Sequence, residues 1–360
     1  MAIRSVLVTG GTGFVGSAIV DALLEKYPAC SITVLDLDTE GKTKSSSVSY
    51  VCGDINNFED ISKAISQGKP EVVIHTAGIV PPLRERYRRR IEKEVFRINV
   101  EGTRTVLNAT RDAGIHAFVY TSSCCCVIDN WMNPYPNIDE RWPSAVKSSI
   151  YGESKVPSPS IQVAYASNIA AEKIVHQANS PSFSTCILRP SVLMGPGDHQ
   201  LLPPIHACIA KKETPFVIGA AENLWDITYV TNIADAHVLA AENLLSSNPT
   251  AAGETFFIQN NEPITFRNFS LAVWKEFGHI PPFSIHVSET LAWTAGVLAE
   301  VVSYLTGRTI TLSRWSVNDA CAVRYASGAK AKRILGYEAR VGLEEGIRLS
   351  CEEYKQRLAG

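Results

Sequence analysis

The chain has 360 residues, of which 45% are hydrophobic and 19% are charged, and its formal net charge at pH 7 is −2. This length suits one large α/β domain with a smaller lobe, and the near-neutral charge gives no electrostatic argument for binding nucleic acid. The one basic run, residues 84–90, is followed by acidic residues at 92 and 94, so a solvated helix face is the simpler interpretation.

The nine cysteines do not suggest a disulfide framework. The N-terminus runs directly into an apolar strand, which leaves no room for a secretory leader. No cysteine pair or histidine cluster has metal-ligand spacing, and the consecutive cysteines at 124–126 are more simply explained as small residues at a buried strand end. The sequence therefore predicts a protein of a reducing compartment that uses no metal ion.

A glycine-rich turn follows the first predicted strand, Ser5–Thr9, and an amphipathic helical segment follows the turn. Its G-x-G-x-x-G pattern permits a tight reversal, close approach of the backbone to a pyrophosphate, and close packing of helix on strand. The N–H groups and dipole at the start of the helix also favour phosphates. The turn therefore predicts a dinucleotide site, with the binding residues Gly10, Gly11, Thr12, Gly13, Phe14, Val15 and Gly16.

The second predicted strand, Ser31–Leu35, is followed at once by Asp36. This carboxylate lies about 20 residues beyond the last glycine of the turn, where an acidic residue binds the adenosine ribose in NAD sites. It would accept hydrogen bonds from the ribose diol and repel the 2′-phosphate of NADP. Asp38 and Glu40 add negative charge, and the first basic residue is Lys42. The sequence therefore favours NAD as the cofactor.

Strand-like and helical segments continue to alternate through the first half of the chain, which is typical of βαβ units. The further predicted strands are Ser49–Cys52, Val72–His75, Ala117–Tyr120 and Thr185–Leu188, and the clearest helix is Val100–Ala113. We expect an α/β fold with a Rossmann-type doubly wound parallel sheet. Residues 1–195 would form the NAD-binding domain, and some later segments would return to it.

After about residue 195 the pattern loosens. Helical patterns cover Leu202–Lys211, Ile233–Leu245 and Leu343–Arg357, and an apolar stretch covers Leu291–Leu305. We expect residues 196–360 to form mainly a smaller substrate-binding lobe.

A tyrosine and a lysine four residues apart, Tyr151 and Lys155, follow a Thr-Ser-Ser sequence that ends at Ser123. Residues at this spacing share one face of a helix. Near a nicotinamide, the phenol can exchange the proton of an alcohol, the ammonium can lower the pKa of the phenol, and the serine can orient the substrate oxygen. Ser123, Tyr151 and Lys155 are therefore the predicted catalytic residues.

With the segments VTGGTGFVG, VVIHTAG, INVEGT, YTSS and LRPSVLMGPGD, the chain resembles the extended short-chain dehydrogenase/reductases. More narrowly it resembles the 3β-hydroxysteroid dehydrogenase family, which includes the sterol-4α-carboxylate 3-dehydrogenases (decarboxylating). The resemblance runs nearly end to end, and the block 216–242 is its most specific part. It implies that Asp54 holds the adenine edge, that Ala77 and Asn99 line the cofactor path, and that Pro190 flanks the nicotinamide.

The chain departs from the family just after the catalytic pair. In the family the Tyr-Lys pair runs straight into a helix, whereas here residues 156–168, with two prolines, intervene. Tyr165 is a second candidate for the phenol, but the residue four places on is Ile169, which cannot lower a phenol pKa, so Tyr151 with Lys155 is favoured. An unspliced intron would produce the same in-frame insertion, and the interruption leaves open a catalytically inactive NAD-binding protein.

The favoured function is NAD-dependent oxidation of a 3β-hydroxyl on a sterol-, steroid- or triterpenoid-like substrate. A 4-carboxylate on that substrate would become part of a β-keto acid, which loses CO₂ readily because the enolate is resonance-stabilised. A sugar-nucleotide epimerase or dehydratase is the alternative enzyme, but its diphosphate needs polar and basic groups. The C-terminal lobe instead offers apolar residues: Trp225, Leu291, Trp293, Val297, Leu298, Val301 and Val302.

The apolar stretch 291–305 is shorter than the roughly 20 residues needed to cross a bilayer, and it contains Glu300. It is either a buried helix of the lobe or a helix that lies on a membrane and admits a lipid-like substrate. The resemblance supports the second interpretation. We therefore expect peripheral association with the endoplasmic reticulum, or a cytoplasmic location, and we leave a homodimer open.

Overall fold

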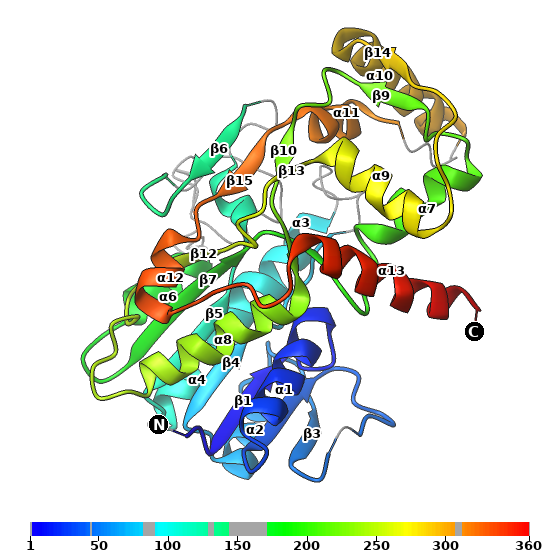
Figure 1. The fold of residues 1–360 in the computed structure, drawn as a ribbon. Helices are drawn as coiled ribbons and strands as arrows, with labels where there is room; N and C mark the ends of the chain where they lie inside the picture. Colours follow the sequence, from blue (N-terminus) through cyan, green and yellow to red (C-terminus); the bar gives the residue numbers. More distant parts are fainter. Residues whose placement is uncertain are drawn as a thin grey trace.

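The computed structural model describes residues 2–43, 45–81, 91–128, 133–143, 171–306 and 312–359. A seven-stranded sheet lies at its centre, with all neighbouring strands parallel, in the order β12-β7-β5-β4-β1-β2-β3 (Figure 1). The strands are β1 (Ser5–Thr9), β2 (Ser31–Asp36), β3 (Val48–Cys52), β4 (Val72–His75), β5 (Ala117–Thr121), β7 (Ser184–Pro190) and β12 (Thr255–Ile258).

Strand order reverses beside β1, because the chain first builds β2 and β3 on one side and then β4 and β5 on the other. Ligands of doubly wound sheets bind outside the carboxyl ends of the strands at such a switch point. The predicted fold class is confirmed, and all six predicted strands are present.

Helices cover both faces of this sheet. One face packs against α1 (Phe14–Lys26), α8 (Val230–Leu244) and α12 (Ala329–Leu335), and the other against α2 (Phe58–Gly68), α4 (Thr103–Asp112) and α6 (Ala171–Ala178). The alternation of side chains along a strand explains the two cores. In β1, Val6 and Val8 pack on the α1 and α8 side, whereas Leu7 packs on the α2 and α4 side. A short helix, α3 (Glu92–Phe96), and a π-helical turn, η2 (Arg97–Gly102), lead into α4.

Two elements from the second half of the chain belong to these layers. Helix α8 packs beside α1, and β12 extends the sheet by pairing with β7, with Ile258 opposite Pro190. The sequence predicted the helix over 233–245 but did not predict β12, which lies in the second half of the chain where strands and helices no longer alternate regularly.

The remaining elements form a lobe beyond the carboxyl ends of the strands (Figure 1). They are η3 (Cys124–Val127), β6 (Tyr135–Ile138), β8 (Val192–Met194), α7 (Leu202–Ala210), β9 (Phe216–Ile218), β10 (Leu224–Trp225), β11 (Ile227–Tyr229), β13 (Ile264–Thr265), α9 (Phe266–Glu276), β14 (Ile285–Val287), α10 (Glu289–Thr306), α11 (Arg314–Cys321), β15 (Arg324–Ala326) and α13 (Leu343–Ala359). Figure 1 shows α10, α11, β9 and β14 together at the end of the molecule remote from the sheet.

The apolar stretch 291–305 lies within α10, and this helix is not a buried core helix. Leu298 is 67% exposed and Val301 is 50% exposed, whereas the small residue Ala292 is buried. Gly296 lies so close to α11 that a Cβ atom there would be 2.6 Å from the backbone nitrogen of Arg314. The helix therefore packs through small residues and turns large apolar side chains outward. In the described part of the chain, no helix is both long enough and apolar enough to cross a membrane.

Candidate active site

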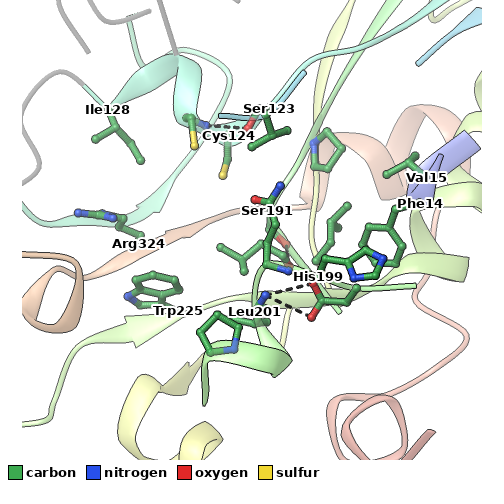
Figure 2. Close-up of a pocket in the computed structure, with 18 of the residues that line it drawn as sticks. Phe14, Val15, Ser123, Cys124, Ile128, Ser191, His199, Leu201, Trp225 and Arg324 are labelled. Carbon is green, nitrogen blue, oxygen red and sulfur yellow. Dashed lines mark hydrogen bonds between the residues drawn. The ribbon is translucent and has the colours of Figure 1, made fainter. Parts of the chain in front are cut away.

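A cavity of about 1370 Å³ extends from the glycine turn into the C-terminal lobe. This volume exceeds the roughly 300–1,000 Å³ of a pocket for one small molecule, so it has room for a dinucleotide and a second ligand. In Figure 2, Ser123 and Ser191 lie between Phe14 and Val15 on one side and Trp225 and Arg324 on the other. The cavity thus has a cofactor end at the sheet and a second chamber in the lobe.

The glycine turn brings the start of α1 to the wall of the cavity. Gly10 has a φ of +73°, and a Cβ atom there would lie 2.7 Å from the backbone of Ala77. A Cβ atom at Gly16 would lie 2.1 Å from the carbonyl oxygen of Gly10, so this position also excludes a side chain. The predicted residues of the turn that line the cavity are Gly10, Thr12, Gly13, Phe14, Val15 and Gly16.

Gly11 does not line the cavity. A Cβ atom at this position would lie 2.8 Å from Val34, so Gly11 permits packing of the turn on β2. Gly11 therefore serves the packing of the turn, and its predicted role in cofactor binding stays a prediction.

Asp36 lies at the end of β2 and lines the cavity. Its Oδ2 atom accepts a hydrogen bond of 3.0 Å from the N–H of Thr12, and its Oδ1 atom accepts one of 2.8 Å from the N–H of Leu37. An ionised carboxylate has about four lone-pair sites, so both oxygens can still accept hydrogen bonds from a ribose diol. The glycine turn therefore orients the carboxylate that the sequence assigns to NAD, and these residues fit that cofactor.

Asp54 and Ala77 also line the cavity. Oδ1 of Asp54 accepts hydrogen bonds from the backbone and side-chain nitrogens of Asn56, both at 2.9 Å. Burial raises the pKa of Asp54, but these hydrogen bonds and the positive charge of Arg97 outweigh that effect and lower it. Asp54 is therefore held ionised in the wall of the cavity.

Asn99 is not among the residues that line the cavity. Its expected place along the cofactor path stays a prediction. It is fully buried, its Oδ1 atom accepts from the N–H of Ile79 at 2.8 Å, and its Nδ2 atom donates to the carbonyl of Ile79 at 3.0 Å. Asn99 thus fixes the loop after β4, which carries Ala77.

Ser123 and Pro190 line the middle of the cavity, at the ends of β5 and β7. The Oγ atom of Ser123 accepts a hydrogen bond of 3.2 Å from the N–H of Cys125 at the start of η3, which orients the hydroxyl. The other two predicted catalytic residues, Tyr151 and Lys155, lie outside the described residues, as do Tyr165 and the insertion 156–168.

A buried ion pair lies directly behind Ser123 and Pro190. Arg189 donates to Glu172 through Nε at 2.9 Å and through Nη2 at 2.8 Å, and the Oγ of Ser122 donates to Oε1 of Glu172 at 2.5 Å. All three residues are at least nine-tenths buried. Burial by itself raises the pKa of Glu172, but the charge of Arg189 and the hydrogen bonds outweigh it and lower the pKa. The pair therefore joins α6, β5 and β7 behind Ser123 and Pro190.

The chamber in the lobe is largely apolar, with Ile128, Trp225, Phe266 and Leu291 among its lining residues. Arg324 of β15 also lines it, with its guanidinium 5.7 Å from the ring centre of Trp225. The pKa of Cys124 is raised by a hydrogen bond with Cys125 and by burial, and the charge of Arg324 opposes this rise. Arg324 therefore acts electrostatically on the segment that follows Ser123. The sequence analysis did not single out Arg324, and an isolated arginine in a strand offers no pattern to find.

The model of the 3-beta hydroxysteroid dehydrogenase/isomerase family matches residues 7–288. The chain belongs to this family. This membership confirms the resemblance and identifies the chain as an NAD-dependent oxidoreductase that acts on a hydroxyl group.

Two curated relatives extend over nearly the whole chain. The sterol-4-alpha-carboxylate 3-dehydrogenase, decarboxylating, of Saccharomyces cerevisiae is 37% identical and covers 96% of each chain. The enzyme with the same description from Mus musculus is 32% identical, over 96% of this chain and 90% of its own.

Solved structures share the fold at lower sequence identity. UDP-glucose 4-epimerase of Thermus thermophilus, in complex with NAD, has a TM-score of 0.68 and 22% identity and covers 97% of this chain and 98% of its own. dTDP-glucose 4,6-dehydratase of Bacillus anthracis, also with NAD, has a TM-score of 0.69 and 17% identity, over 98% of this chain and 97% of its own. These likenesses concern the fold alone.

Proposed function

We propose that this protein oxidises the 3β-hydroxyl group of a sterol 4-carboxylate with NAD, and that the resulting β-keto acid loses CO₂. The observation that carries the proposal is the division of the cavity into a dinucleotide end and an apolar chamber that contains a cation, Arg324. The names of the relatives from yeast and mouse support the same substrate.

The reaction gives each predicted catalytic residue a separate role. Bound NAD supplies the acceptor for the hydride from C3. Ser123 would hold the substrate oxygen, Tyr151 would take the hydroxyl proton, and Lys155 would favour the ionised phenol. In the β-keto acid, the bond from C4 to the carboxyl carbon then breaks, its electrons form the enolate, and C4 takes up a proton. The protein need only hold the β-keto acid in place for this step.

The distribution of charge in the chamber favours a sterol acid over a sugar nucleotide. A diphosphate needs several convergent cations, but the arginines that line the described cavity are dispersed. Arg97 pairs with Asp54 at 3.8 Å at the adenosine end, and Arg267 donates to the carbonyl of Thr214 at 2.8 Å. Arg324 lies among apolar residues on the far side of Ser123, where a single carboxylate next to the reacting alcohol would meet it.

The test is an incubation with NAD and paired 3β-hydroxysteroids that differ only in the 4-carboxylate, with NADH and CO₂ both measured. We expect NADH and CO₂ in equal amounts from the acid. Arg324→Gln should lower the oxidation of the acid far more than that of the steroid without the carboxylate, because only the acid has a negative charge for Arg324 to bind. Failure of the wild-type protein to produce NADH from either steroid would contradict the proposal.

We also propose that α10 contacts the endoplasmic reticulum membrane, so that the substrate reaches the cavity from the lipid. Phe216 and Leu291 are 51% and 61% exposed, yet both line the cavity, so an apolar surface adjoins its wall. Leu298 and Val302 continue this surface along the helix. In this proposal, residues 1–195 with α8 and β12 carry NAD, and most of residues 196–360 hold the substrate.

A further inference from the structure

Gln259 follows β12 and has an unusual environment. The residue is only 1% exposed, yet it lines the cavity. Neither Oε1 nor Nε2 has a hydrogen-bond partner among the described residues, although its backbone carbonyl accepts from the hydroxyl of Tyr337 at 3.0 Å. A buried amide without partners destabilises the folded protein, so such a group in a cavity wall indicates a polar partner that binds there.

The position of Gln259 in the sheet shows which ligand it can reach. Asp36 lies on β2 and Pro190 on β7, so the predicted path of the dinucleotide crosses the sheet from one strand toward the other. Strand β12 lies one place beyond β7, with Ile258 opposite Pro190, and the N–H of Ser191 donates to the carbonyl of Ile258 at 3.2 Å. Gln259 is therefore adjacent to the nicotinamide end but lies beyond it, on the side of the substrate.

The alternation of side chains gives the direction of the amide. Ile258 packs in the core beneath α1 and α8, whereas Phe257 packs with Ile128 of the chamber and with Ala326 of β15. Continuing the alternation places Gln259 on the same face as Phe257. It therefore faces the chamber from β12, and β15, which also carries Arg324, contacts the same cluster.

We propose that the side-chain amide of Gln259 binds the carboxylate of the sterol acid. This inference rests on the proposed function and adds a specificity-determining residue to it. The Nε2 group has two N–H donors, which suit an anion, and rotation of the amide can present them to the chamber. A neutral donor can assist Arg324 without adding a second buried charge, which would cost desolvation energy.

The experiment uses Gln259→Leu in the full-length protein with the paired steroids. The variant should reduce kcat/KM for the 4-carboxylated steroid by about 10- to 100-fold, the usual effect of losing a hydrogen bond to a charged group. The value for the partner without the carboxylate should stay near that of the wild type. The melting temperature should not fall, because an apolar side chain replaces an amide without partners. Gln259→Glu should reduce use of the acid further by repelling its carboxylate.

Asn223→Leu is the matched control. Asn223 is also buried and lines the cavity, and its Nδ2 atom has no partner in the part of the chain that the structure describes. It precedes β10, beside Phe266, and so lies away from β12 and next to the strand whose Trp225 pairs with Arg324. The variant therefore tests the role of Gln259 while Arg324 itself is kept. This variant should leave the preference for the carboxylate unchanged.

The outcomes separate this inference from the proposed function. Gln259→Leu could lower kcat/KM equally for both steroids, or weaken NAD binding measured by calorimetry. Either result would show that the amide does not bind the carboxylate. An unchanged preference in a protein that oxidises the acid would overturn this inference alone. A wild-type protein that oxidises neither steroid would overturn the proposed function and this inference together.

Discussion

Replacing Glu172 by glutamine removes one charge from the buried ion pair and changes the side-chain volume little. In the wild-type protein, the carboxylate accepts from Arg189 at 2.9 and 2.8 Å and from Ser122 at 2.5 Å. The variant keeps one oxygen as an acceptor but places an NH₂ group against the guanidinium. Arg189 is only 5% exposed, so water cannot replace the lost charge.

The expected loss follows from this geometry. Removing one partner of a buried pair typically costs about 3–5 kcal/mol, because the other charge stays buried without compensation. We therefore expect Glu172→Gln to lower the free energy of unfolding by about that amount. In the double variant Glu172→Met/Arg189→Met, apolar residues replace both charges, and most of the loss should be recovered.

Urea unfolding followed by tryptophan fluorescence measures these differences, and pH provides a second check. The pKa of Glu172 is lower than its ordinary value of 4.5. The pair therefore adds its full stability above the unfolded-state pKa, and loses it as the pH falls through the lower, folded-state pKa. The gap between wild type and Glu172→Gln should be widest at neutral pH and narrow in acid.

The exposed pair Lys332–Glu338, at 2.8 Å, provides the surface control. Glu338→Gln should leave the urea midpoint nearly unchanged, because solvent screens this pair. If Glu172→Gln costs no more than Glu338→Gln, the reasoning from burial is refuted.

Three further predictions concern the cofactor, the phenol and the membrane. Asp36→Ala should weaken NAD binding relative to NADP in calorimetry, because it removes acceptors for the ribose diol; an unchanged ratio would mean that the carboxylate does not meet the ribose. Tyr151→Phe should lower turnover on the order of 10²–10⁴-fold with little change in NAD affinity, whereas Tyr165→Phe should have little effect; the reverse result would assign the phenol to Tyr165. Leu298→Lys should release a folded protein from microsomes, because this side chain is 67% exposed; folded protein that stays bound would rule out contact through α10.

Local sequence patterns predicted most of the central sheet and the glycine turn. Each of the six predicted strands is a run of apolar residues between turns, and the glycine turn and Asp36 are fixed by their spacing along a single βαβ unit. For this reason the residues predicted at the dinucleotide end mostly share one cavity. Gly11 and Asn99 do not line this cavity. Gly11 packs against Val34, and Asn99 forms hydrogen bonds with Ile79.

The substrate end could not be predicted in the same way. Arg324 and Gln259 reach the chamber only through tertiary pairing, β15 with β10 and β12 with β7. Neither residue belongs to a recognisable motif. Gln259 follows a short apolar segment and Arg324 lies within another, and such segments are as typical of a protein core as of a binding site. Glu172 of α6 likewise meets Arg189 of β7, although most of the helix, a turn and most of the strand separate them in the sequence.

The pairing of β12 with β7 has a consequence for synthesis of the chain. During translation, β7 is made before residues 191–254, and until β12 emerges its outer edge has unpaired N–H and C=O groups. Such an edge can pair with another chain and start aggregation. A fragment that ends near residue 195 would keep this edge exposed beside Pro190. We therefore expect the nucleotide-binding half to aggregate when it is expressed by itself. A chain that stops before Ile258 should aggregate for the same reason.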